Sequence, residues 1–172
     1  MALEIRAVEP SEAAALGEVT VAAYASAPGF SADDAYFADL ADVARRAEVA
    51  RVLVAVDDGA VVGGVTYVPR PGPYAEFDDP EGAGIRMLAV APHAQNRGVG
   101  KALVRECATR ARAEGRARLW LHTTPELAVA QRMYEREGFR RAPEHDWQGD
   151  GYRLLGYVLD LSEWGRRGSN PH

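Results

Sequence analysis

The chain has 172 residues, of which 47% are hydrophobic and 26% charged, and its formal net charge is -5. This length fits one domain with a core of ordinary size and leaves no room for a second catalytic domain. The negative charge argues against a nucleic-acid partner, because sequence-independent binding to nucleic acid needs a basic face. Cys107 is the only cysteine, which excludes an intrachain disulfide and favours a reducing compartment. We therefore expect a cytoplasmic protein.

Neither an export signal nor a membrane span is expected. The N-terminal segment Met1–Arg6 has an early acidic residue and no apolar core of signal length. Nowhere does an uninterrupted apolar run reach the roughly 18 residues that a membrane-spanning helix needs. The sequence therefore predicts a protein without a membrane partner.

The beginning of the chain predicts one strand followed by two helices. Apolar and charged residues alternate over Leu3–Val8, as in a strand. Apolar residues then recur at helical spacing over 10–24 and 32–49, with Pro28-Gly29 between the two segments. Aromatic residues at this spacing belong more often to a core than to a substrate pocket, and both roles stay open. These residues are Tyr24, Phe30, Tyr36 and Phe37.

A hairpin and a long loop follow. The valine-rich segments Arg51–Val56 and Ala60–Val68 flank Asp57-Asp58-Gly59, and an Asp-Gly pair tolerates the positive φ angles of a tight turn. The segment Pro69–Gly84 holds several prolines and glycines and predicts a long loop. Four carboxylates in this loop could attract a cationic amine or could simply be solvated. They belong to Glu76, Asp78, Asp79 and Glu81.

A strand, a glycine-rich turn and a helix follow one another after Ile85. The apolar run ends at Pro92, and a helix is predicted over 100–114. The first turn of a helix leaves backbone N–H groups unpaired at the positive end of the macrodipole, where anions bind. Gly98 and Gly100 would let a diphosphate approach these amides without steric hindrance. The pattern therefore predicts an anion-binding turn.

Two familiar phosphate-binding loops do not fit this turn. A P-loop needs a glycine five positions before the Gly-Lys pair and a Ser or Thr after it, where this chain has Gln95 and Ala102. A dinucleotide-binding fingerprint needs a third glycine, where this chain has Leu103. An ordinary strand-turn-helix without a ligand stays open as an alternative.

The rest of the chain predicts two further strands around a helix, and a further extended segment that begins at Phe139-Arg140. Leu119–Thr123 is expected to be a strand, Pro125–Glu137 a helix that Gly138 ends, and Tyr152–Leu161 the closing strand. Pairing of a second copy along the closing strand could build a homodimer. The glycine- and proline-containing segment 162–172 is expected to be a flexible tail.

Two blocks of sequence resemble the GNAT family of N-acetyltransferases. Gln95-Asn96-Arg97-Gly98-Val99-Gly100 is similar to the family's Q/R-x-x-G-x-G/A acyl-CoA pyrophosphate motif. The segment 121–139 resembles the second signature, in which a tyrosine, variable residues and Gly138-Phe139 close the helix after the fifth strand. The resemblance covers roughly Leu3–Leu161, with specific motifs only from Ile85 onward.

The resemblance implies a single α/β GNAT domain over residues 1–161. Its sheet would be mixed, mostly antiparallel and built from six to seven strands, with helices on both faces and the fourth and fifth strands splayed apart. The implied activity is transfer of an acetyl group from acetyl-CoA to a primary amine of a small molecule or peptide by direct attack in a ternary complex. Implied cofactor-binding residues are Leu88, Ala89, Val90, Gln95, Asn96, Arg97, Gly98, Val99, Gly100 and Lys101.

Two residues are candidates for proton transfer. The resemblance assigns Tyr134 to the tyrosine that protonates or hydrogen-bonds the departing thiolate. His122 stands where some members place a glutamate base, and an unperturbed imidazole has a pKa of about 6.5, near working pH. Packing roles stay open for both residues. Leu127 departs from the family because many members have an asparagine there that contacts the cofactor, and Gln131 or Thr124 could compensate.

Two other functions stay open at this point. The chain could be a CoA-binding sensor or interaction module with little turnover, or an acyltransferase that uses a longer acyl-CoA. No metal is expected, because His93, His145 and His172 show no ligand spacing and one cysteine cannot build a thiolate cluster. The sequence leaves undecided the amine acceptor, the general base, the preferred acyl chain and the oligomeric state.

Overall fold

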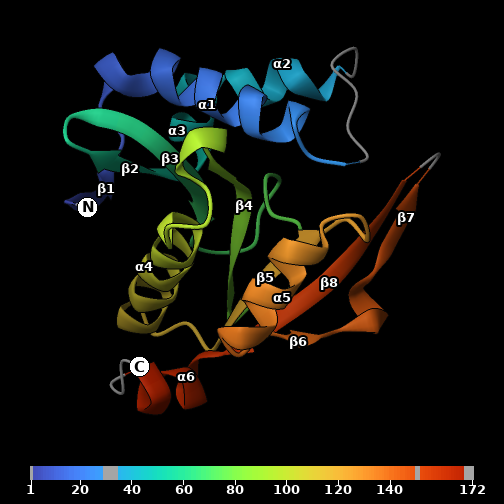
Figure 1. Cartoon of the computed structure of the whole chain (residues 1–172). Helices are drawn as coiled ribbons and strands as arrows, with labels where there is room; N and C mark the ends of the chain where they lie inside the picture. Colours follow the sequence, from blue (N-terminus) through green and yellow to red (C-terminus); the bar gives the residue numbers. More distant parts are fainter. Residues whose placement is uncertain (1, 29–34, 150–151, 169–172) are drawn as a thin grey trace. The chain divides into compact units, whose positions relative to one another are not determined.

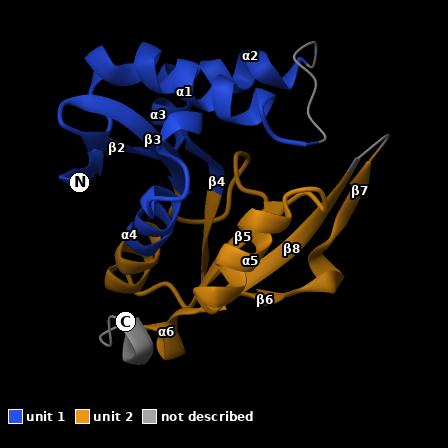
Figure 2. Cartoon of the chain, viewed as in Figure 1, with its two compact units in different colours: residues 1–67, 86–106 blue, residues 68–85, 107–172 orange. Residues whose placement is uncertain are grey.

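The computed structural model describes residues 2–28, 35–149 and 152–168 (Figure 1). The chain divides into two compact units, unit 1 with residues 1–67 and 86–106 and unit 2 with residues 68–85 and 107–172 (Figure 2). Strand β4 (Gly82–Val90) and helix α4 (Val99–Ala113) each pass from one unit into the other.

Unit 1 has the strand order β1-β2-β3-β4. The hairpin between β2 and β3 turns at Asp58 and Gly59, both with positive φ, as the Asp-Gly pair predicts. Helices α1 to α3 connect β1 to β2. The elements are β1 Leu3–Ala7, η1 Pro10–Glu12, α1 Ala13–Ala25, α2 Tyr36–Ala41, α3 Val43–Val49, β2 Arg51–Asp57, β3 Ala60–Val68 and η2 Pro92–Ala94.

Two adjacent glycines in β3 let helices pack closely on both faces of unit 1. A Cβ at Gly64 would lie 2.5 Å from a methyl of Leu16 in α1, whereas a Cβ at Gly63 would lie 3.1 Å from Val99 in α4. Successive residues of a strand point to opposite faces. Helices α1 and α4 therefore cover opposite faces of this sheet, and the prediction of helices on both faces is confirmed.

The single helix expected over 32–49 is two helices that meet at Asp42. Asp42 has φ -88° and ψ 69°, outside the helical region, and its carboxylate accepts a hydrogen bond from the Arg45 N–H at 3.2 Å. It thereby caps α3. Phe37 is buried against Leu40, so its alternative role in the core is the one observed. Phe30 lies outside the described residues.

Unit 2 has the strand order β4-β5-β8-β6, and β7 also pairs with β8. The parallel β4–β5 register joins Gly82–Gly84 to Arg118–Trp120 and ends three residues before the end of β5. Over the described residues the sheet has eight strands, against the six to seven expected. Strand β6 lies in the extended segment predicted from Phe139-Arg140, whereas the short strand β7 was not predicted. The elements are β5 Arg118–Thr123, α5 Ala128–Arg136, β6 Arg140–Arg141, η3 Pro143–His145, β7 Trp147–Gly149, β8 Tyr152–Asp160 and α6 Leu161–Gly168.

The closing strand β8 has neighbours on both sides. It pairs with β5 along one edge and with β6 and β7 along the other. The pairing with β5 covers residues 155–160 of β8 and does not include residues 152–154. A homodimer through this strand therefore stays a prediction. The segment expected as a tail begins with helix α6.

An ion pair fastens the loop before β4 to β5. Asp79 accepts hydrogen bonds from Arg118 Nε at 2.6 Å and Nη2 at 3.0 Å, and from the Trp120 indole N–H at 3.0 Å. The Arg118 bonds, followed by smaller contributions that include Trp120, hold the pKa of Asp79 well below its ordinary value. The Asp79 carboxylate therefore has a structural role, and its hydrogen bonds leave it unsuited to binding a cationic amine.

We expect Asp79→Asn to lower the free energy of unfolding at neutral pH by about 1–2 kcal/mol, since it removes a partly buried, charge-assisted bond. Because the folded-state pKa of Asp79 is depressed, its contribution is present above the unfolded pKa of about 3.9 and is lost as pH falls below that value. Urea unfolding at a series of pH values measures both effects. The control is Asp78→Asn at an exposed neighbouring residue, which should change neither the free energy of unfolding nor its pH dependence. Equal effects of the two variants would contradict the structural role of Asp79.

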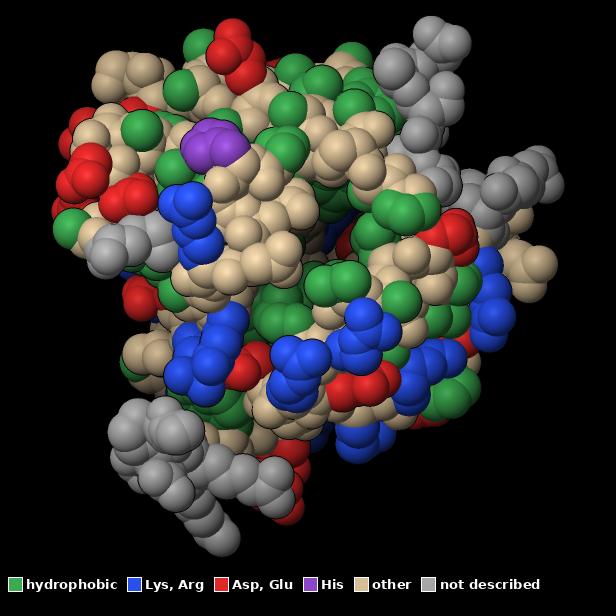
Figure 3. Space-filling model, in the orientation of Figure 1, with side chains coloured by type: hydrophobic (Ala, Val, Ile, Leu, Met, Phe, Trp, Pro, Cys, Tyr) green, Lys and Arg blue, Asp and Glu red, His purple; other side chains and the backbone are tan. Residues whose placement is uncertain are grey.

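The visible surface carries mixed charge. Figure 3 shows Lys and Arg side chains interspersed with Asp and Glu, so no continuous basic stripe crosses this face. Among the described residues, no helix is long and apolar enough to cross a membrane.

Candidate active site

The glycine-rich turn presents its backbone to solvent at the start of α4. Asn96 has φ 65° and Gly98 has φ 83°, and residues 95–98 are exposed. The N–H of Ala102 donates to the Gly98 carbonyl at 3.0 Å and begins the hydrogen-bond ladder of the helix. The N–H groups of the preceding residues in the first turn therefore have no intrahelical partner.

Two contacts hold this turn in place. Val99 is 1% exposed and packs against β3 at Gly63. The Gln95 side-chain amide donates to the Val90 carbonyl at 3.2 Å and ties the turn to the end of β4. Gln95, predicted to bind cofactor, therefore fixes the turn through its amide nitrogen.

The predicted cofactor-binding segment of β4 follows a strained residue. Met87 has φ 55°, a left-handed conformation that costs a non-glycine residue about 1–3 kcal/mol. Its side chain is buried with Phe37 and Leu40, and this packing opposes the strain. Leu88 and Val90 then lie half-buried on either side of the buried Ala89. A strained residue thus immediately precedes the three residues that the family resemblance singles out.

The turn suits a diphosphate because its backbone N–H groups can donate hydrogen bonds and because no side chain covers Gly98. A Cβ at Gly98 would meet no atom within 4 Å, so the side from which a ligand would come is clear. Arg97 and Lys101 are exposed beside the amides and can add positive charge. These are the features that the diphosphate of CoA requires.

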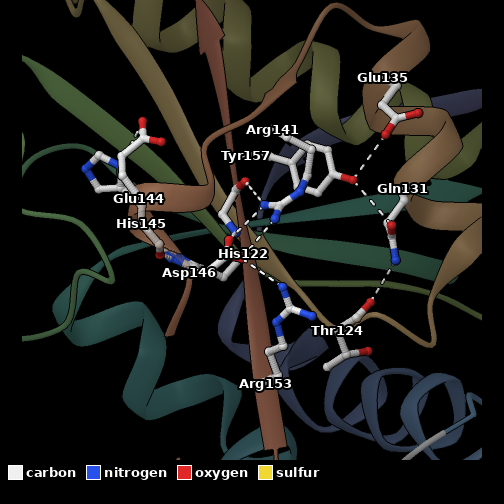
Figure 4. A network of polar contacts seen from close by, with 11 residues as sticks. His122, Thr124, Gln131, Glu135, Arg141, Glu144, His145, Asp146, Arg153 and Tyr157 are labelled. Carbon is white, nitrogen blue, oxygen red and sulfur yellow. Dashed lines mark hydrogen bonds and ion pairs between the residues drawn. The ribbon is translucent and has the colours of Figure 1, made fainter. Parts of the chain in front are cut away.

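His122 lies on β5 opposite Gly156 of β8. Its Nε2 is 2.9 Å from the carbonyl oxygen of His145 (Figure 4). A carbonyl only accepts hydrogen bonds, so Nε2 must carry the proton. In the neutral ring, Nδ1 then keeps a lone pair; this atom is buried and has no hydrogen-bond partner within the part of the chain that the structure describes. The geometry therefore fixes the tautomer and leaves one site for a further proton.

Tyr134 lies on α5 with its ring packed between two aromatic neighbours. Its centroid is 5.7 Å from that of Phe139 and 6.3 Å from that of Tyr157, and only 6% of the residue is exposed. Burial, with a smaller contribution from Cys107, raises the pKa of Tyr134 well above its ordinary value. The hydroxyl therefore stays protonated and is a hydrogen-bond donor at any working pH.

The side chains of His122 and Tyr134 lie on opposite faces of the β5–β8 sheet. Trp120 and Val158 share one face with Ala142 and Phe77, and His122 points to that face because it is two residues from Trp120. Tyr157, one residue from Val158, contacts α5 and Tyr134 on the other face. The two candidate proton-transfer groups are therefore not brought into one cluster.

Gln131 holds the loop between β5 and α5. Its amide donates to the Thr124 and Pro125 carbonyls, each at 3.0 Å, while its oxygen accepts from the Tyr157 hydroxyl at 3.3 Å. Gln131 is thus occupied and does not replace the asparagine missing at Leu127. The Thr124 hydroxyl is buried and makes no hydrogen bond to any described residue.

Sequence reasoning missed the structural roles of three residues. Met87, Asp79 and Asp146 carry no local signal, because their roles depend on contacts with distant segments. Within the described ranges, no group of three or more His, Cys, Asp and Glu side chains is arranged to hold a metal ion.

Comparisons with known proteins identify the family to which the chain belongs. A family model described as the acetyltransferase (GNAT) family matches residues 18–139. Mycothiol acetyltransferase of Acidothermus cellulolyticus is 45% identical over 75 residues, which are 42% of this chain and 22% of that protein. The chain thus spans about a fifth of the length of this relative.

Solved structures share the fold. PaiA N-acetyltransferase of Thermoplasma acidophilum, in complex with coenzyme A, superposes with a TM-score of 0.75 at 16% identity, covering 93% of this chain and 99% of that one. YncA of Salmonella typhimurium, with its cofactor acetyl-CoA, gives 0.69 at 21% identity, covering 94% and 95%. Because the family model matches well over half of the residues, the chain belongs to the GNAT family of acetyltransferases.

Proposed function

We propose that the protein transfers an acetyl group from acetyl-CoA to a primary amine by direct attack in a ternary complex. The observation that carries this proposal is the entrance of α4, where exposed amides, Arg97 and Lys101 surround an unobstructed glycine turn. The acceptor is a small molecule or a peptide, and the protein acts in the cytoplasm without a metal.

His122 is proposed as the base. An amine attacks only in its neutral form, so a group must accept its proton. The hydrogen bond to the His145 carbonyl occupies Nε2 and leaves the Nδ1 lone pair for this purpose. Nδ1 is buried and has no protein partner among the described residues, so the proton of the amine would reach it through a water.

Tyr134 is proposed to stabilise the departing thiolate by hydrogen bonding. An ordinary tyrosine already lies about 1.5 pKa units above an ordinary thiol, so full proton transfer to a thiolate is uphill by about 2 kcal/mol. Burial raises the pKa of Tyr134 further and makes the transfer less favourable still. The hydroxyl therefore donates a hydrogen bond and keeps its proton.

Tyr134→Phe should lower kcat about 30-fold while the affinity for CoA stays unchanged, since a hydrogen bond to a charged group contributes about 2 kcal/mol. Steady-state kinetics and calorimetric titration with CoA separate the two quantities. Tyr157→Phe is the matched control, because it removes a hydroxyl that bonds Glu135 and Gln131 and should reduce stability more than kcat. Undiminished turnover of Tyr134→Phe would remove this residue from the mechanism.

The activity itself is tested by free-thiol release from acetyl-CoA across a panel of primary amines. Amine-dependent release is the expected result. CoA binding without turnover on a broad panel would instead identify a sensor or interaction module. Repeating the measurement with propionyl- and succinyl-CoA tests the acyl preference, and analytical ultracentrifugation tests whether the protein forms a homodimer.

A further inference from the structure

Asp146 lies at the centre of a clamp beside His122. Its carboxylate accepts two parallel hydrogen bonds from Arg141, each 2.8 Å, and one from Arg153 at 3.3 Å (Figure 4). It also accepts the backbone N–H of Gly156 at 2.8 Å. These bonds, those from Arg141 first, hold the pKa of Asp146 well below its ordinary value, so the carboxylate stays ionised.

The clamp fixes a short turn against the sheet. The N–H of Asp146 donates to the Pro143 carbonyl at 3.0 Å, and the N–H of His145 donates to the Ala142 carbonyl at 2.9 Å. Ala142 in turn donates to the Gly156 carbonyl at 2.9 Å, and Arg141 donates to the same oxygen at 2.7 Å. Residues 141–146 are therefore bound to β8 at Gly156 by both backbone and side-chain bonds.

Gly156 allows the main chain of His145 to lie directly on β8. A Cβ there would be 3.0 Å from the Ala142 carbonyl oxygen and 3.1–3.2 Å from His145 Cβ and carbonyl carbon. Gly156 is also the register partner of His122. The missing side chain at this position is thus what brings the His145 carbonyl within reach of the His122 ring.

We propose that Asp146 is a positioning residue that, with Gly156, holds the His145 carbonyl against His122 Nε2 and so reserves Nδ1 for the substrate proton. This inference rests on the proposed role of His122 as the base. Asp146 itself does not touch the reacting atoms; it acts through the turn. Among the described residues, the charged groups at the turn include Arg141 and Arg153, which bind Asp146, and Glu144 in η3, whose carboxylate is 3.7 Å from His145 Nδ1.

The tautomer can be observed directly. In protein labelled with ¹⁵N-histidine, long-range ¹H–¹⁵N spectra distinguish the protonated nitrogen from the bare one, and His122→Gln identifies the His122 signals among the four histidines. We expect the wild-type ring in the Nε2–H form. A wild-type ring in the Nδ1–H form would overturn the inference at once.

Asp146→Asn removes the charge that holds both arginines and should convert His122 into a mixture of tautomers, with a kcat about 5-fold to 10-fold lower and an unchanged KM for acetyl-CoA. Asp146→Glu should restore part of the kcat because it keeps the carboxylate. Glu144→Gln is the matched control on the same turn, since its carboxylate is exposed and outside the clamp. If Asp146→Asn fails to fold, Gly156→Ala tests the same point by displacing His145.

The outcomes separate this inference from the function on which it rests. An altered tautomer together with a lower kcat supports both. A tautomer that does not change in folded Asp146→Asn or Gly156→Ala overturns the positioning role. An altered tautomer with full kcat would support the clamp and overturn the proposal that His122 is the base.

Discussion

Gly100→Val should weaken the affinity for CoA about 100-fold, which corresponds to about 2.7 kcal/mol. Gly100 is the second residue of α4, in the turn whose amides precede the first helical hydrogen bond at Ala102. A branched side chain there would stand between the diphosphate and those amides. Losing one or two charge-assisted bonds, each contributing about 1.5–3 kcal/mol, accounts for this magnitude. Isothermal titration calorimetry with CoA measures it.

The matched control for this variant is Ala113→Val. Ala113 is exposed in the last turn of the same helix, so the substitution carries a similar β-branched cost without approaching the α4 entrance. Its CoA affinity should equal that of the wild type. If Gly100→Val also binds CoA normally while remaining folded, the diphosphate does not bind at this turn, and the proposed function loses the observation that carries it.

The glycine-rich turn at the start of α4 was predictable from sequence because it is local. Its glycines, the proline before it and the helical pattern after it are all contiguous, and a positive φ at Gly98 is what a glycine at that position favours. The β2–β3 hairpin was predictable for the same reason. Both features depend on a few neighbouring residues whose backbone preferences tertiary contacts did not override.

Features that depend on distant contacts were not predictable. No residue near Asp146 in the sequence predicts that its carboxylate will bind the N–H of Gly156. In the same way, no residue near Asp79 predicts its ion pair with Arg118, which is 39 positions away. Met87 adopts a left-handed conformation within an apolar run that reads as an ordinary strand, because packing against α2 opposes the strain. The break at Asp42 was missed because a helical pattern continues on both sides of it. The sequence correctly predicted that Tyr134 lies on a helix. That its side chain and that of His122 lie on opposite faces of the sheet follows only from the pairing of β5 with β8.

His122→Gln should lower kcat about 100-fold or more, the usual contribution of a positioned general base. Glutamine is chosen because its side-chain N–H₂ can still donate to the His145 carbonyl, which keeps the partner of Nε2 satisfied. What the variant lacks is the second ring nitrogen with its free lone pair. The affinity for CoA should not change, because the α4 entrance lies elsewhere in the chain.

The control for this loss is His93→Gln, the same substitution at an exposed histidine, which should leave kcat unchanged. A second discriminating observation is the dependence on the amine. If His122 accepts the proton of the attacking amine, raising the pH or using an amine of lower pKa should recover part of the lost rate, since more of the substrate is then already neutral. A loss of kcat that stays the same for every amine and at every pH would instead assign His122 to packing between β5 and the 141–146 turn, and another group would have to take the proton.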